Sequence, residues 1–120
     1  MRVLHMDQGQ LSLREQPVPE LSPGEVLIRP TLMGICNTDI ELLAGYYGFS
    51  GVAGHEFVGV VEEAPDNEEL VGKRVVVDIN AACRQCAWCH SGRHRHCPNR
   101  TTIGIVNHDG CFAERLKAPA

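Results

Sequence analysis

The strongest signal in the chain is the stretch Cys83–His90, Cys-Arg-Gln-Cys-Ala-Trp-Cys-His, which is followed by Cys97-Pro98. It places four cysteines within fifteen residues. Thiolates at this spacing can meet at one tetrahedral ion, because each Cys-x-x-Cys step aims two sulfurs at a point about 2.3 Å away. The spacing predicts a structural zinc site in what we call the cysteine lobe (residues 83–100), with the ligands Cys83, Cys86, Cys89 and Cys97.

An iron–sulfur cluster and a set of disulfides or free thiols are the alternatives for these cysteines. In bacterial ferredoxins three residues precede the last cysteine of a similar run, whereas seven separate Cys89 from Cys97. No second Cys-rich block is present. In a reducing compartment, clustered cysteines bind metal more often than they form disulfides. Zinc is therefore the interpretation that we favour.

The cysteine lobe is also basic. Four thiolates around a dication leave two net negative charges, which four arginines would offset: Arg84, Arg93, Arg95 and Arg100. A nucleic-acid surface is the alternative, but the whole chain carries a net charge of −4 and a single Trp, so we predict no nucleic-acid partner. A closed four-coordinate site needs no further ligand, so we expect three histidines to be solvated: His90, His94 and His96.

The length of 120 residues fits one domain and is too short to hold a dinucleotide-binding domain as well. No Gly-x-Gly-x-x-Gly occurs between an expected strand and helix, so the phosphate-binding fingerprint of such a domain is missing. The N-terminus has no apolar run of signal-peptide length, and no segment approaches about 18 consecutive apolar residues. We predict a cytoplasmic protein with no membrane partner.

Short apolar stretches separated by Gly and Pro predict a fold made mainly of β-strands. A helix is expected at Thr38–Gly45, because Thr-x-x-Glu is a capping box and glycine ends helices. The pattern indicates a β-barrel or sandwich with minor helical elements. The expected strands are Arg2–Met6, Leu11–Glu15, Glu25–Ile35 with a kink at Pro30, Val75–Ile79, and Ile103–Val106 with Cys111–Leu116 around an Asp109-Gly110 turn. Gly54–Val61 is expected to be a turn that runs into a further strand.

Two residues outside the lobe stand where active-site residues often lie. Cys36 follows the end of an expected strand, and His55 precedes another in a glycine-flanked turn. Taken singly, a buried Cys is most often an inert small side chain, and a lone His is most often a loop or core residue. Their neighbours favour a metal site, since Asp39 could accept the second ring N–H of a metal-bound His55. Glu56 adds a carboxylate, and Thr38 adds a hydroxyl that could pass on a proton.

Five blocks of the sequence occur in the order found in a known enzyme family. They are Gly34–Asp39 (Gly-Ile-Cys-Asn-Thr-Asp), Gly54–Val61 (Gly-His-Glu-Phe-Val-Gly-Val-Val), Gly72–Val75 (Gly-Lys-Arg-Val), the cysteine lobe, and Gly110–Glu114 (Gly-Cys-Phe-Ala-Glu). Over nearly its whole length the chain resembles the zinc-dependent medium-chain alcohol dehydrogenases. The resemblance implies a mainly β, GroES-like domain, which is a partly open β-barrel with short helices and a zinc-binding lobe.

The resemblance also implies roles for individual residues. Cys36 and His55 would bind a catalytic zinc, with Glu56 close enough to enter its coordination. Asp39 would orient His55, and Thr38 would relay the substrate proton unless its hydroxyl is engaged as the helix N-cap. The implied reaction transfers hydride from a small-molecule alcohol to NAD or NADP, and the full-length protein is expected to be a homo-oligomer.

The chain departs from the family pattern at Arg84 and Cys111, where glycine is common, and we expect neither to touch a proposed ligand. The family's third ligand to the catalytic zinc should lie some tens of residues beyond Cys111, with the dinucleotide-binding domain after it. We therefore expect residues 1–120 to be the N-terminal catalytic portion of a longer dehydrogenase, and to be inactive alone.

Two other functions compete with this one. The chain could be a stand-alone zinc-stabilised structural or binding module, or a GroES-like relative of reductases that performs no zinc catalysis. Cys36 and His55 discriminate between these, because a purely structural module has no need of both. For three aromatic residues, a substrate pocket and the packing of the barrel both stay open: Tyr46, Tyr47 and Phe49.

Overall fold

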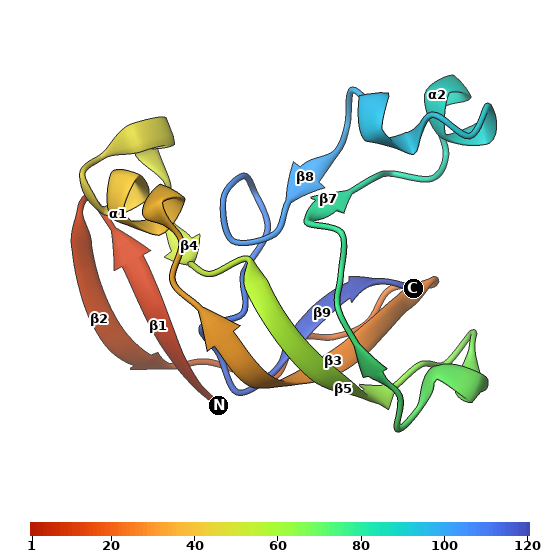
Figure 1. The fold of residues 1–120 in the computed structure, drawn as a ribbon, viewed down its shortest axis with the longest axis horizontal. Coiled ribbons are helices and arrows are strands. Elements are labelled where there is room, and N and C mark those ends of the chain that lie inside the picture. Colours follow the sequence, from red (N-terminus) through yellow and green to blue (C-terminus); the bar gives the residue numbers. More distant parts are fainter.

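The computed structural model describes all of the chain, Met1–Ala120, and consists mainly of short strands with few helices (Figure 1). The strands are β1 (Arg2–Asp7), β2 (Gln10–Glu15), β3 (Glu25–Gly34), β4 (Gly51–Val52), β5 (Glu56–Glu63), β6 (Arg74–Val75), β7 (Asn80–Ala81), β8 (Thr101–Thr102) and β9 (Leu116–Pro119). The helices are α1 (Asn37–Leu43) and α2 (Ala87–His90), with the 3₁₀ turns η1 (Tyr46–Gly48), η2 (Glu68–Leu70) and η3 (His94–His96). Neither α-helix has the length and apolar character that a membrane span requires.

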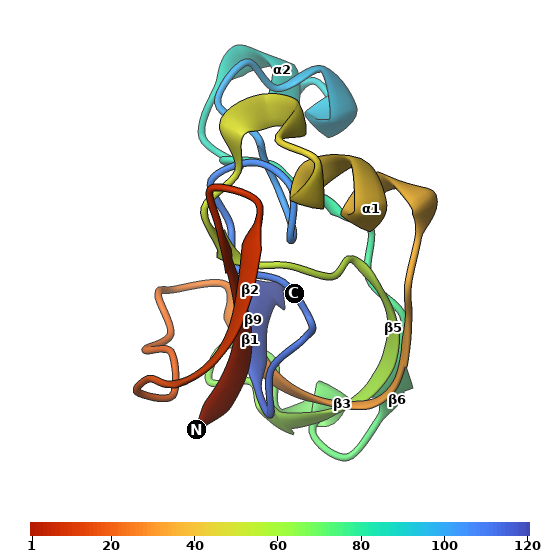
Figure 2. The same ribbon diagram turned by 90° about the vertical axis from the view of Figure 1, so that its left-hand side faces the viewer.

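The strands form three antiparallel sheets, in the orders β2-β1-β4, β6-β5-β3-β9 and β7-β8. The four-stranded sheet is strongly curved (Figure 2). Its long β3–β5 pairing is irregular between Pro30 and Leu32, in agreement with the kink expected at the proline. Because the sheets do not join into one closed cylinder, the barrel is partly open, as predicted.

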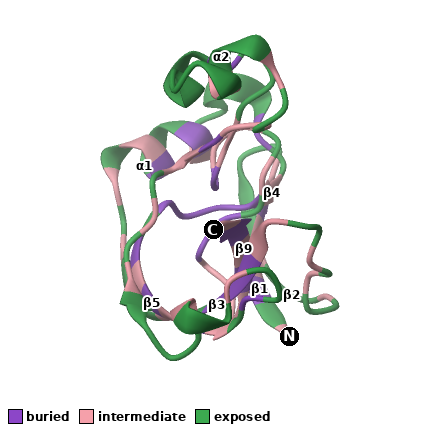
Figure 3. Ribbon diagram, turned by 90° about the vertical axis from the view of Figure 1, so that its right-hand side faces the viewer, coloured by how far each residue is buried: buried purple, intermediate pink, exposed green.

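The main core lies inside this curved sheet. Strand β5 alternates, so that Phe57, Gly59 and Val61 are buried while the residues between them are more exposed. Gly59 has no substitute here, since a Cβ at this position would lie 2.4 Å from the Cγ2 atom of Ile28. A second small core packs Met6, Leu42, Phe49 and Ala53 together and holds α1 against β1. In Figure 3 the buried residues, in purple, lie along the strands and loops of the barrel, whereas the cysteine lobe around α2 is mostly exposed, in green.

A helix of about the predicted length is present after Cys36, but its predicted start was wrong. Helix α1 begins at Asn37, and its N-cap is Cys36 rather than Thr38. The capping carboxylate belongs to Asp39, whose Oδ2 accepts the backbone N–H of Cys36 at 2.8 Å. Thr38 therefore lies within the first turn, and its hydroxyl is free of the capping role.

The expected hairpin of Ile103–Val106 with Cys111–Leu116 was wrong. Residues 110–112 do not pair with residues 103–106, because their backbone N–H groups donate instead to the carbonyls of residues 52–54. Gly104 has a φ of +67° and a backbone in contact with Gly54, which turns the chain away from an extended path. The strand expected at Val75–Ile79 is also shorter, since only Arg74 and Val75 have partners on β5.

Candidate functional site

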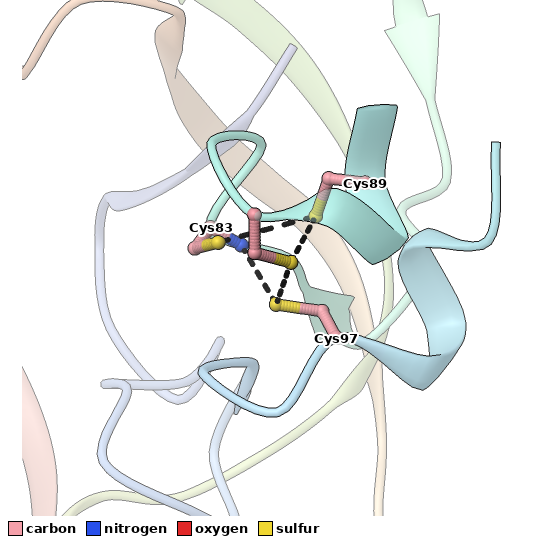
Figure 4. A group of neighbouring side chains, drawn as sticks. Cys83, Cys89 and Cys97 are labelled. Carbon is pink, nitrogen blue, oxygen red and sulfur yellow. Dashed lines mark hydrogen bonds between the residues drawn. The ribbon is translucent and has the colours of Figure 1, made fainter. Parts of the chain in front are cut away.

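The cysteine lobe brings its four sulfur atoms together (Figure 4). The Sγ–Sγ distances are 3.5 Å for Cys86–Cys89, 3.8 Å for Cys86–Cys97 and 4.0 Å for Cys83–Cys89, and all four sulfurs lie within 4.8 Å of one another. Four sulfurs at 2.3 Å from a tetrahedral zinc would be about 3.8 Å apart. The donor set and its spacing therefore fit a zinc ion with no open position.

Local structure explains how this convergence arises. Cys86 is the N-cap of α2 and Cys89 lies within the helix, so one short turn sets two of the sulfurs. Between Cys83 and Cys86 the chain turns at Arg84, which has a φ of +60°. A left-handed backbone of this kind favours glycine, and glycine is common at this position in the family that the chain resembles. All six cysteines of the chain are free thiols.

The four thiols differ in acidity. The backbone N–H of Gln85, with further hydrogen bonds from its neighbours, lowers the pKa of Cys83 to about 6. Burial, reinforced by hydrogen bonds from the neighbouring thiols, raises the pKa of Cys89 to about 12. A bound dication would therefore have to displace at least the proton of Cys89.

The arginines of the lobe only partly fit the expected charge offset. Arg93 stacks on Trp88, with its guanidinium carbon 4.9 Å from the ring centroid. Arg95 pairs with Asp78 at 3.3 Å, and Arg84 donates to the carbonyl of Ala120. Of the four guanidinium groups, only that of Arg100 donates to a cysteine residue, at the carbonyl of Cys97. Three histidines are exposed, as expected, and none joins the sulfur cluster: His90, His94 and His96.

A second group of metal-capable atoms lies beside the barrel, and we call it the Cys36–His55 site. One ligand atom each of Cys36, His55 and Glu56 lies within 4.8 Å of the others. The sheet register explains the meeting, because Gly34 at the end of β3 is paired with Glu56 at the start of β5. This pairing brings Cys36, two residues after Gly34, beside the turn that carries His55.

Asp39 connects the two halves of this site. Its Oδ1 lies 3.5 Å from Nδ1 of His55, while its Oδ2 accepts the backbone N–H of Cys36. Both side chains are more than nine-tenths buried, and neither Oδ1 nor Nδ1 has a hydrogen-bond partner at normal distance. With Nδ1 facing the carboxylate, Nε2 is the ring atom left to a metal. A buried carboxylate with one oxygen left unpaired is costly unless a nearby cation compensates its charge.

Thr38 and the three aromatic residues differ in where they lie. Thr38 Oγ1 lies 3.7 Å from Cys36 Sγ, at the edge of the Cys36–His55 site. Phe49 packs in the core, whereas Tyr46 and Tyr47 are 56% and 67% exposed and do not pack the barrel.

Cys111 was missed by sequence reasoning. We expected it to touch no proposed ligand, but its Sγ lies 3.8 Å from the carbonyl oxygen of Glu56. Burial raises the pKa of the Cys111 thiol to about 12, so it stays protonated at neutral pH. The only sequence signal was its departure from the usual glycine.

Comparisons with known proteins agree with this fold. The D-altritol 5-dehydrogenase of Agrobacterium fabrum is 39% identical over 91% of the chain and 34% of its own length, and the L-threonine 3-dehydrogenase of Streptomyces avermitilis is 39% identical over 92% and 34%. The crystal structure of RspB from Escherichia coli, an alcohol dehydrogenase complexed with NADH, matches 100% of the chain and 36% of its own, with a TM-score of 0.86 and 34% identity.

The chain thus spans about a third of the length of these relatives. The model of the alcohol dehydrogenase GroES-like domain matches residues 22–120. This agrees with the predicted partly open barrel and with the order of the five sequence blocks. The chain belongs to the family of alcohol dehydrogenase GroES-like domains.

Proposed function

We propose that residues 1–120 are the catalytic domain portion of a longer zinc-dependent dehydrogenase, which transfers hydride from a small-molecule alcohol or polyol to NAD or NADP. The observation that carries the proposal is the convergence of Cys36, His55 and Glu56 beside the buried carboxylate of Asp39, whose Oδ1 has no hydrogen-bond partner. The relatives named above support it, since they are dehydrogenases of a polyol and of a hydroxyl-bearing amino acid.

Three side chains of this chain would hold the catalytic zinc: the thiolate of Cys36, Nε2 of His55 and the carboxylate of Glu56. Glu56 is exposed, so it is the ligand that a substrate oxygen or a further protein ligand could replace. A zinc ion held there would be a Lewis acid, which lowers the pKa of a bound hydroxyl. Asp39 fixes the ring of His55 and, through the Cys36 N–H, the start of α1.

Thr38 is the residue that we propose to take up the hydroxyl proton of the substrate. Its Oγ1 lies next to Cys36 Sγ, and because Cys36 rather than Thr38 is the N-cap, the hydroxyl can both accept and donate. In the oxidation, the proton leaves the alcohol oxygen and the hydride, which carries two electrons, leaves the carbon. The nicotinamide cofactor would bind outside these residues, as the chain lacks the glycine-rich fingerprint.

The cysteine lobe has a different task in this proposal. Four sulfurs complete a tetrahedral site and leave no position for a substrate, so Cys83, Cys86, Cys89 and Cys97 would hold a structural zinc. We place the full-length enzyme in the cytoplasm, where free thiols persist. A homo-oligomeric state remains a prediction.

The test uses the full-length protein and two matched histidine variants. His55→Ala should lose at least about a hundredfold in kcat/KM for its alcohol, because a catalytic zinc normally needs three protein ligands. His96→Ala removes an exposed histidine that belongs to neither set of converging ligand atoms, and this variant should retain activity. If His55→Ala oxidises the alcohol as fast as the wild type, the chain is not the zinc-catalytic part, and a zinc-stabilised structural or binding module becomes the better description.

A further inference from the structure

The turn that carries His55 is held from one side by residues 110–112. Three backbone N–H groups of this segment donate to the carbonyl oxygens of residues 52–54 at distances of 2.7–3.0 Å. This pairing replaces the hairpin expected from the sequence. It fixes the backbone immediately before His55.

Cys111 also reaches the other side of the same histidine. Its backbone N–H donates to Gly54 O at 2.9 Å, and its thiol donates to Glu56 O at 3.8 Å. These two contacts bracket His55 in the sequence, one residue before it and one after it. No other side chain donates a hydrogen bond to either of these carbonyls.

The space around the thiol is closely filled. Cys111 is fully buried, and a Cβ on Gly54 would lie 2.8 Å from its Sγ atom. A side chain larger than Cys at position 111 would press on the turn, and a smaller one would leave a gap beneath it. Cys111 is nevertheless outside the set of converging ligand atoms, which consists of Cys36, His55 and Glu56.

We propose that Cys111 is a positioning residue for the Cys36–His55 site, whose backbone N–H and thiol hold the carbonyls of Gly54 and Glu56 and thereby fix the ligands His55 and Glu56 relative to each other. This inference rests on the proposed catalytic metal. Ligands that are held before the metal arrives bind it more tightly, and groups that orient them typically contribute 10–100-fold in affinity.

The test measures cobalt and zinc binding by the full-length protein in competition with a chelator, for the wild type, Cys111→Ser and Cys111→Ala. The four-cysteine site serves as an internal reference in every sample. Cys111→Ala should bind the second metal ion about tenfold more weakly. Cys111→Ser keeps a donor of similar size and should remain within about threefold of the wild type, and the first metal should be unchanged in both.

Thermal unfolding of the same variants separates positioning from general support of the fold. If Cys111→Ala lowers Tm but leaves the dissociation constant of the second metal unchanged, the positioning role is wrong. If serine fails to restore the affinity, the hydrogen bond to Glu56 is not the cause and the proposal is overturned. A wild-type protein that binds only one metal per chain refutes the proposed catalytic zinc itself, and the role of Cys111 with it.

Discussion

The cysteine lobe and the Cys36–His55 site are both groups of metal-capable side chains, but the chain builds them in opposite ways. In the lobe, four ligands come from fifteen consecutive residues and a single short helix. In the Cys36–His55 site, Cys36 follows the end of β3, whereas His55 and Glu56 lie at the start of β5, and the β3–β5 pairing brings them together. The lobe is complete with four sulfurs, whereas the other site has three candidate ligands, one of them exposed. In our proposal, local sequence builds the closed structural site and the fold builds the open one.

The largest expected effect comes from breaking the lobe. Cys86→Ser removes the sulfur that lies closest to two others, at 3.5 and 3.8 Å. Zinc binding in small domains of this kind is worth on the order of 10 kcal/mol of folding free energy, so residues 83–100 should lose their zinc and become open to proteolysis. Metal analysis and limited proteolysis check this result, with Ser91→Ala as a control in the same lobe. Full zinc content in Cys86→Ser, or four cysteines paired as disulfides in the wild type, would falsify the structural zinc.

The Cys36–His55 site should respond to a subtler change. Asp39→Asn keeps an acceptor for the Cys36 N–H but removes the charge that faces His55. We expect metal affinity at this site to fall about tenfold or more, with the lobe unaffected. Asp78→Asn, which alters an exposed carboxylate, is the matched control. Equal loss of metal from both sites in Asp39→Asn would show that the two regions are not independent.

Two thiols of the cysteine lobe differ in acidity, so zinc binding there should depend on pH. Without metal, Cys83 has a pKa of about 6 and Cys89 one of about 12, so at neutral pH Cys83 is mainly thiolate and Cys89 is a thiol. Because zinc must displace at least one proton, its affinity for the lobe should rise at least about tenfold for each pH unit between about 6 and 9. Chelator competition at pH 6, 7 and 8 measures this slope. An affinity that does not change with pH contradicts the assignment of thiols as ligands.

The smallest effect concerns a strained turn in the lobe. Arg84 has a φ of +60°, so Arg84→Gly should stabilise the zinc-loaded protein by up to about 1 kcal/mol, although it loses an exposed hydrogen bond to Ala120. Arg93 has a φ of −106°, and Arg93→Gly should instead destabilise it by about 0.5–1 kcal/mol. Thermal unfolding distinguishes the two variants. A lower Tm for Arg84→Gly would mean that the left-handed backbone is not a source of strain.

The same contrast explains what the sequence could and could not predict. The cysteine spacing was sufficient for the convergence of four sulfurs, because all the contacts are local. The helix after Cys36 was also found, but two overlapping capping patterns compete there, and Asp39 rather than Glu41 supplies the capping carboxylate. Cys36 and His55 carried little weight singly, and they were linked by the neighbouring Asp39 and by the order of the sequence blocks.

The features that were missed depend on distant residues. The segment 110–112 was expected to pair with its sequence neighbours, yet it pairs with residues 52–54. Its contact between Cys111 and Glu56 spans 55 positions in the chain. Neither periodicity nor spacing reports such pairings, because they are chosen by the packing of glycine backbones at Gly54, Gly104 and Gly110.

A zinc titration of the polypeptide Met1–Ala120 against a competing chelator, with an assay of reduced cofactor formation on several alcohols, tests the contrast between the two sites most directly. We predict one tightly held zinc per chain, lost in Cys86→Ser and kept in Cys36→Ser. The second zinc should bind weakly or not at all, because Glu56, the third candidate ligand, is exposed. No alcohol should be oxidised, because these residues also contain no cofactor fingerprint. Two equally tight zinc ions, or measurable turnover by this polypeptide, would contradict the account.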